Sequence, residues 1–304
     1  MKLRYKILWI DDDFQYVERH IAGIEQFLWS YGIEPSIERI EASSETPVQD
    51  QVKPHLDDPE IDLLAVDYKL EDQLGNVLIQ HIRESKHIYL PVIFYSSNRP
   101  ALLEEVSKQA LDGVYLSGRG QLKEKAIEVI SSLLVKEQTV KRARGLLIEG
   151  ASELDSNLGE IFVGFWGKLS DEERDTITRY ANRIIKGRAK SAANRSEKFP
   201  VERNTFYEHM ADGFTSDSYD AMFRWKVIAK MLRILGVQGD KLDTFLMLFN
   251  TDENNPDRYL MDMRNDYAHQ TRAELGKDHD DSKCILIRNE LRRHTANINA
   301  LKEV

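Results

Sequence analysis

The chain has 304 residues, 41% of them hydrophobic and 31% charged, and a chain of this length usually folds as two domains. Its net charge of -9 argues against a generic nucleic-acid coat protein but permits a local basic surface. One cysteine, Cys284, cannot form an internal disulfide, and its apolar helical neighbours indicate a buried thiol in a reducing compartment. We find no signal-peptide pattern and no run of about 18 apolar residues, so we expect a cytoplasmic protein without a membrane contact.

The first half alternates short apolar runs with amphipathic segments, which is typical of a parallel α/β domain. The strand candidates are KILWI, DLLAV, PVIFYS and GVYLS. Apolar residues at spacings of three and four predict packing helices over residues 16–31, 76–85, 100–111 and 121–135. We therefore predict an α/β doubly wound parallel sheet of the flavodoxin-like type over residues 1–140.

The second half has a different pattern, with no convincing strand after about residue 142. Apolar residues form one helical stripe from Leu158 to Leu169, and the pattern repeats over residues 219–235 and 284–301. A polar interval near 187–204 and a turn at 254–256 interrupt it. The segment KEQTVKRARG at 136–145 has high helix propensity, which predicts one continuous helix across the join. We predict an all-α bundle over residues 141–304.

Acidic side chains follow two of the predicted strands. Asp11, Asp12 and Asp13 end the first strand, and Asp67 ends a later one. Because the carboxyl ends of parallel strands face one crevice, these acids should meet there. Clustered carboxylates repel one another unless a cation offsets their charge, and an oxygen-rich crevice suits Mg²⁺. Asp67 would then be the nucleophile toward a phosphoryl group; in the alternative interpretation the acids only cap loops.

Two more side chains belong to this interpretation. Ser96 ends PVIFYS, where its hydroxyl is placed to hydrogen-bond a phosphoryl oxygen, and Tyr115 is an aromatic residue that would repack when that bond forms. The alternative is that the hydroxyl has no role in binding. Spacing by itself does not separate the two interpretations.

Residues 5 to about 135 resemble the receiver domain of two-component response regulators. The resemblance rests on KILWIDDD, DLLAVDYKL, PVIFYSS and VYLS in this order, with Gly75 eight residues after Asp67. It implies that Asp12 and Asp67 hold Mg²⁺ together with the Lys69 backbone carbonyl, while Asp11 acts through water. It also implies that Asp67 accepts a phosphoryl group from a histidine kinase or another phosphodonor.

The chain departs from the receiver pattern at one position. The family has a lysine just after the strand that VYLS forms, whereas this chain has Ser117-Gly118-Arg119. Arg119 supplies a positive charge, but a guanidinium fork differs in geometry from an ammonium group. We still expect Asp67 to accept phosphate. If phosphodonors leave Asp67 unmodified while Mg²⁺ binds, the domain is a degenerate dimerisation module.

The peptide Met263-Arg264-Asn265-Asp266-Tyr267-Ala268-His269 groups a cation, an amide and an imidazole. Asn265 and His269 share a helix face, whereas Arg264 lies about 140° around the helix from His269. Two copies facing each other in a symmetric dimer would line one cleft with every group twice. There His269 would move the proton of an RNA 2'-OH, Arg264 would stabilise the phosphorane, and Asn265 would hold the phosphate or orient the imidazole. The plain alternative is a surface helix with polar pairs.

The form Arg-Asn-x-x-x-His in a helical domain resembles the HEPN family of helical ribonucleases and nucleotide-binding modules. The resemblance implies a bundle of helices, a homodimer, and RNA cleavage without a metal cofactor that leaves a 2',3'-cyclic phosphate. It also implies a setting in bacterial signalling, stress or antiviral defence. The looser pattern, an arginine followed by a histidine four to six residues later, also occurs at Arg203/His209 and Arg288/His294.

A basic block lies between residues 179 and 203, with eight Lys/Arg against two Glu. It is either an RNA phosphate-binding surface or a solvated helix face, and we prefer RNA contact through Arg183, Lys186, Arg188 and Lys190. Three functions follow for the whole chain. They are a receiver-gated endoribonuclease acting on RNA such as tRNA, a non-catalytic adaptor that binds a partner or nucleotide, and a transcriptional regulator. The last is disfavoured because the helical half lacks clear helix-turn-helix punctuation.

Overall fold

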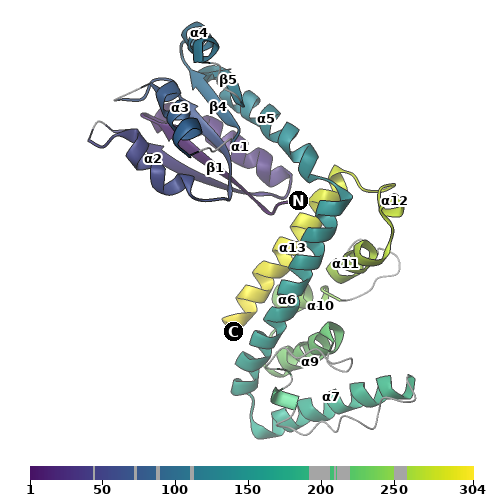
Figure 1. Cartoon of the computed structure of the whole chain (residues 1–304). Helices are drawn as coiled ribbons and strands as arrows, with labels where there is room; N and C mark the ends of the chain where they lie inside the picture. The colour runs from purple at the N-terminus through teal and green to yellow at the C-terminus, as the bar shows by residue number, and fades with distance from the viewer. Residues whose placement is uncertain are drawn as a thin grey trace. The chain divides into compact units, whose positions relative to one another are not determined.

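The computed structural model describes residues 1–43, 45–71, 74–86, 90–109, 113–191, 206–208, 210, 220–249 and 259–304. The side chains of residues 84–86, 101, 105, 107–109 and 188–191 also lie outside this description. The chain divides into two compact units, Met1–Thr139 and Val140–Val304 (Figure 1). Among the helices described, none combines the length and the apolar character that crossing a membrane requires.

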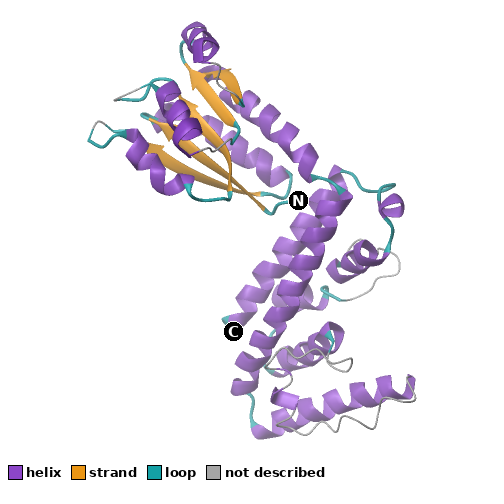
Figure 2. Ribbon diagram, viewed as in Figure 1, coloured by secondary structure: helices purple, strands orange, loops and turns teal. Residues whose placement is uncertain are grey.

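The N-terminal unit contains a five-stranded parallel sheet in the order β2-β1-β3-β4-β5. This is the flavodoxin-like doubly wound order, and Figure 2 shows the sheet flanked by helices. The predicted fold class is therefore confirmed. The strands are β1 (Arg4–Asp11), β2 (Glu34–Glu41), β3 (Ile61–Asp67), β4 (Val92–Ser96) and β5 (Val114–Gly118). The helices are α1 (Glu18–Ser30), α2 (Val48–Leu56), α3 (Gly75–Lys86), α4 (Arg99–Gln109) and α5 (Leu122–Glu137).

Alternating side chains of the central strands build two cores, one on each face of the sheet. Ile7 and Trp9 of β1 pack with buried residues of α1 and α5. Leu8 and Ile10 point the other way and pack with buried residues of α2 and α3. Because both faces are covered, the strands read as nearly continuous apolar runs, which is why the sequence predicted them.

Two elements of this unit were missed. The strand β2 has the sequence EPSIERIE and pairs only with β1, at the edge of the sheet. Ile40 is its only fully buried residue, so its apolar pattern is weak. The helix α2 spans nine residues and contains Pro54, which shortens the periodic signal.

In the C-terminal unit every regular element of the described residues is a helix, as predicted. Its long helix α6 packs against α13, α11 and α9. Leu158, Phe162 and Phe165 of the predicted stripe are buried on α6. The helices are α6 (Val140–Lys168), α7 (Asp171–Ser191), α9 (Ala221–Ile234), α10 (Asp240–Leu246), α11 (Leu260–His269), α12 (Arg272–Leu275) and α13 (Asp281–Lys302).

The predicted continuous helix over residues 136–145 is wrong. Helix α5 ends at Glu137 and α6 begins at Val140. The backbone of Gln138, with φ -89° and ψ 52°, lies outside the helical region although its N–H still reaches the carbonyl of Leu134. Summed helix propensity is a weak guide where two compact units meet. The predicted turn at 254–256 lies outside the described residues.

Candidate functional site

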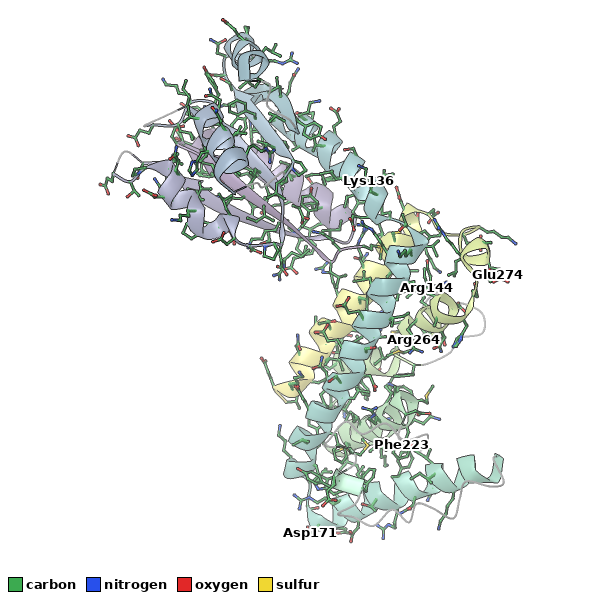
Figure 3. All side chains as sticks on the ribbon, viewed as in Figure 1. Lys136, Arg144, Asp171, Phe223, Arg264 and Glu274 are labelled. Atoms are coloured by element: carbon green, nitrogen blue, oxygen red, sulfur yellow. The ribbon has the colours of Figure 1, made fainter. Side chains whose placement is uncertain are left out.

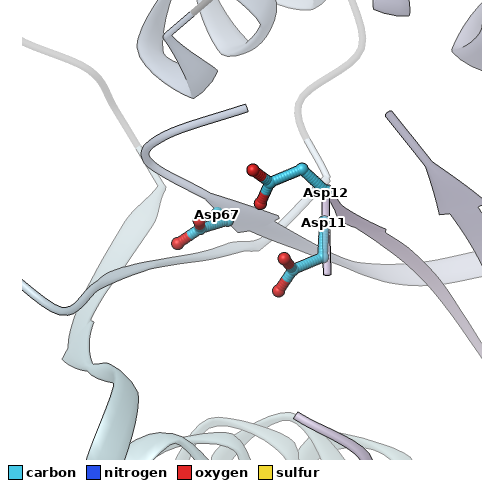
Figure 4. A group of neighbouring side chains, drawn as sticks. All are labelled: Asp11, Asp12 and Asp67. Carbon is cyan, nitrogen blue, oxygen red and sulfur yellow. The ribbon is translucent and has the colours of Figure 1, made fainter. Parts of the chain in front are cut away.

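Three carboxylates meet at the carboxyl edge of the sheet. Asp11 ends β1, Asp12 follows it, and Asp67 ends the neighbouring strand β3. One oxygen from each of the three lies within 4.8 Å of the others (Figure 4). Asp11 and Asp67 are buried, with exposed fractions of 0% and 2%. The convergence expected from strand order is therefore present.

A chain of hydrogen bonds holds the Asp11 carboxylate. The Trp9 indole N–H donates to the Tyr95 hydroxyl at 2.8 Å, and that hydroxyl donates to Asp11 Oδ2. The Asp13 backbone N–H donates to Asp11 Oδ1 at 3.0 Å. Burial raises the pKa of Asp11, while the Tyr95 and Asp13 bonds act in the opposite direction. The bonds fix the position of the carboxylate from the sheet side.

Arg119 enters the same crevice. It begins a short 3-10 turn directly after β5, and its Nη2 lies 2.7 Å from Asp67 Oδ2 and 4.0 Å from Asp11 Oδ1. Its guanidinium carbon lies 5.7 Å from the centre of the Tyr16 ring. The sequence showed Arg119 where the receiver pattern has lysine, but it did not predict a direct contact with Asp67.

The electrostatics of Asp67 reflect these neighbours. Burial raises the pKa of Asp67 to about 7; the Arg119 guanidinium opposes this rise, and the charges of Asp11 and Asp12 add to it. Asp67 Oδ1 is buried and accepts no hydrogen bond from the described residues. An oxygen-only donor set with such an oxygen fits a hard divalent cation.

The loop after β3 is compact around the Asp67 backbone. The Gly75 N–H donates to the Tyr68 carbonyl at 2.8 Å, and Lys69 forms an isolated antiparallel bridge with Leu74. A Cβ on Gly75 would lie 2.1 Å from the Asp67 carbonyl oxygen. Only glycine therefore fits here. The Lys69 carbonyl, a predicted metal ligand, belongs to this loop, and its ligand role stays a prediction.

The two predicted phosphoryl-responsive residues lie on β4 and β5. Ser96 ends β4, is 4% exposed, and its hydroxyl accepts the Asn98 backbone N–H at 3.0 Å. Tyr115 on β5 is 37% exposed and pairs in register with Ile93. Among the described residues, no hydrogen bond joins Ser96 to the three carboxylates. Ser96 thus keeps its hydroxyl near the crevice without bonding to the acids.

The Arg-Asn-x-x-x-His motif occupies most of α11. Met263 and Tyr267 are buried, Arg264 is half-buried, and Asn265 and His269 are exposed. Arg264 lies on α11 (Figure 3), and its Nη1 donates to Asn265 Oδ1 at 3.0 Å. The His269 imidazole makes no hydrogen bond or ion pair with a described residue. One copy of the helix therefore does not join Arg264 to His269.

An ion pair between a buried arginine and a partly exposed aspartate, next to the motif, was missed. Arg224 on α9 is 1% exposed, and its Nη2 lies 3.2 Å from Asp155 Oδ2 on α6. Burial raises the pKa of Asp155, and the charges of Arg224 and Arg264 both lower it. Asp155 therefore lies within electrostatic range of the motif arginine. An arginine within the apolar run AMFRWKVIAKM was the available sequence signal.

A second cluster anchors the motif helix. The Tyr267 hydroxyl lies 2.7 Å from His279 Nδ1, and His279 Nε2 lies 3.6 Å from Cys284 Sγ at the start of α13. Cys284 is 0% exposed, and burial raises its pKa to about 11, so the thiol is protonated at neutral pH. The predicted buried thiol is confirmed, and it helps to fix α11 next to α13.

The remaining sequence candidates differ in accessibility. Arg288 and His294 are 0% and 1% exposed within α13, so this looser motif cannot reach RNA. Arg203 and His209 lie outside the described residues. In the predicted basic surface, Arg183 and Lys186 are exposed on α7. Arg188 and Lys190 also belong to α7, but their side chains lie outside the description.

No protein-family model matches this sequence, and a search of curated proteins gave no match. The assignment of the fold and of the cluster of three carboxylates therefore comes from the structure alone. The receiver-like and HEPN-like interpretations rest on short motifs in a fitting structural context.

Proposed function

We propose that this chain is a signalling protein with a receiver-like input unit and a HEPN-like endoribonuclease output unit. The observation that carries the proposal is the meeting of Asp11, Asp12 and Asp67 at the carboxyl edge of a β2-β1-β3-β4-β5 sheet. Ligand sites of open α/β sheets lie at this edge. The helical unit adds the exposed pair Asn265 and His269 beside Arg264.

In the input unit, Asp67 is the proposed phosphoryl acceptor. Its carboxylate oxygen forms a bond to phosphorus, and the bond from phosphorus to the donor breaks with its electron pair leaving on the donor. Asp11, Asp12, Asp67 and the Lys69 carbonyl would hold Mg²⁺, which supplies positive charge beside the phosphoryl oxygens. The Ser96 hydroxyl donates a hydrogen bond to one of these oxygens. A histidine kinase or a small acyl phosphate is the donor.

In the output unit, RNA is cleaved by attack of its own 2'-oxygen. That oxygen forms a bond to phosphorus while the bond to the 5'-oxygen breaks, which leaves a 2',3'-cyclic phosphate and a 5'-hydroxyl. His269 takes or returns the proton, and Arg264 stabilises the charge that develops on the phosphorane. Asn265 holds the phosphate. Two copies of α11 in a homodimer supply Arg264 and His269 to one cleft.

One observation favours a second candidate, a non-catalytic adaptor. Arg264 bonds to Asn265 within the same chain, and in the described residues no hydrogen bond joins it to His269. An adaptor would use this exposed surface to bind a partner or a nucleotide. It would need no acid or base and would therefore tolerate loss of the imidazole.

The cleavage test uses purified full-length protein, a tRNA and total-RNA mixture, and EDTA. We expect wild type to cut and His269→Ala to lose at least about 100-fold in rate, as expected for removal of a general acid or base. The product ends should be cyclic phosphates. His294→Ala is an unsuitable control because that side chain is buried. Arg19→Ala, at an exposed position of α1 in the other unit, is a suitable surface control. Absence of cleavage by folded, dimeric wild type favours the adaptor.

The phosphorylation test uses acetyl phosphate with Mg²⁺ and intact-mass detection. Wild type should gain one phosphoryl group and Asp67→Asn should gain none. Binding of Mg²⁺ without any phosphorylation would identify the input unit as a degenerate module.

A further inference from the structure

Arg119 is held by three groups at once in the acidic crevice. Its Nη2 lies 2.7 Å from Asp67 Oδ2 and 4.0 Å from Asp11 Oδ1. Its guanidinium carbon lies 5.7 Å from the Tyr16 ring centre. The two carboxylates are buried, and the arginine side chain is 25% exposed. A cation belonging to the chain therefore already stands against the same carboxylates that would bind a metal.

The chemistry of the crevice makes this position consequential. Two buried carboxylates destabilise each other unless a positive charge stands beside them. A guanidinium carries five N–H donors in one rigid plane, and the face of an aromatic ring attracts its positive charge. One arginine can therefore interact with both carboxylates from a single position. A divalent cation arriving at Asp67 and Asp11 meets this positive charge and is repelled by it.

We propose that Arg119 is the resident counter-ion of the crevice and that Mg²⁺ binds Asp11 and Asp67 in competition with its guanidinium. The inference rests on the proposed function, because Mg²⁺ binding is part of that proposal. Its consequence is specific to this chain. Arg119 offsets the repulsion between the buried carboxylates before a metal binds, and the identity of residue 119 sets the Mg²⁺ concentration at which Asp67 is released from the guanidinium.

The chain offers its own reporter for the test. Trp9 donates to Tyr95, which donates to Asp11, so Mg²⁺ at Asp11 should change Trp9 fluorescence. Mg²⁺ is titrated into the metal-free full chain, with calorimetry as a direct measure and Trp9→Phe to assign the optical signal. The variants are Arg119→Gln, which removes the charge, and Tyr16→Leu, which removes the ring at a 61% exposed position.

A matched control exists in the same unit. Arg39 also lies 5.7 Å from a ring centre, that of Phe14, and pairs with Glu18 at 2.9 Å. Arg39→Gln therefore removes an arginine with the same kinds of partner, but one that forms no ion pair with the three carboxylates among the described residues. It should bind Mg²⁺ as wild type does.

We expect Arg119→Gln to bind Mg²⁺ at least about tenfold tighter than wild type, and Tyr16→Leu several-fold tighter. If the Arg119→Gln variant folds only when Mg²⁺ is present, the result also supports the inference, because Mg²⁺ then replaces the missing positive charge. If Arg119→Gln does not fold in either condition, Tyr16→Leu decides. Affinities that are equal to wild type or weaker overturn the competition while leaving Mg²⁺ binding intact. Absence of Mg²⁺ binding to every variant overturns both the competition and the metal part of the proposed function.

Discussion

The Asp67 carboxyl makes the stability of the input unit depend on pH. Burial raises its pKa to about 7, whereas an unfolded aspartate titrates near about 4. Between these values the folded state binds the proton more tightly, so the free energy of unfolding falls as pH rises from about 4 to about 7. In Asp67→Asn the free energy of unfolding should depend less steeply on pH over this range. Urea unfolding in EDTA across the range measures it, and equal slopes for both proteins would contradict the prediction.

Arg224 illustrates how a buried charge depends on its partner. Replacing it with alanine leaves the Asp155 carboxylate without its ion pair, because Asp155 Oδ2 lies 3.2 Å from the Arg224 guanidinium. The Asp155 side chain is 24% exposed and keeps part of its hydration, so we expect the free energy of unfolding to fall by about 2 kcal/mol, mainly from the lost packing of the buried arginine. Arg233→Ala, at an exposed position on the same helix, should change it by less than about 0.5 kcal/mol. Denaturant unfolding measures both values, and equal losses in the free energy of unfolding for the two variants would contradict the prediction.

At the scale of elements, the loop after β3 depends on one glycine. A Cβ at Gly75 would lie 2.1 Å from the Asp67 carbonyl and 3.0 Å from Val66 Cγ1, so Gly75→Ala must displace the loop. We expect a loss of about 2 kcal/mol in the free energy of unfolding. Gly164→Ala on α6, where nothing lies within 4 Å, should instead stabilise by about 0.5 kcal/mol. Thermal unfolding of the two variants compares them, and a stable Gly75→Ala would refute the account.

The elements also show which parts of the structure were predictable. Apolar runs identified β1, β3, β4 and β5 because these strands are covered on both faces or lie next to such strands. The edge strand β2 was not predicted because Ile40 is its single buried residue and charged residues flank it in the sequence. Strand order placed Asp11 and Asp67 together. No sequence pattern specified that Arg119 turns into the crevice or that Arg224 meets Asp155, because side-chain direction depends on tertiary packing.

At the scale of the whole molecule, the chain consists of two compact units, Met1–Thr139 and Val140–Val304. The first contains the two cores on either face of its sheet, and the second contains the helical core around α6. We therefore expect calorimetry of the full chain to show two unfolding transitions. Asp67→Asn should move only one transition and Arg224→Ala only the other. A single cooperative transition that both variants shift would contradict two independently stable units.

The central claim is that the input unit controls RNA cleavage by the helical unit. The most direct measurement is the rate of RNA cleavage after treatment with acetyl phosphate and Mg²⁺, with EDTA added before the RNA. Wild type, Asp67→Asn and His269→Ala are compared with and without the phosphodonor. The account predicts that the phosphodonor changes the rate of wild type and leaves the rate of Asp67→Asn unchanged. His269→Ala should show no cleavage with or without the phosphodonor. An identical response of wild type and Asp67→Asn would contradict it.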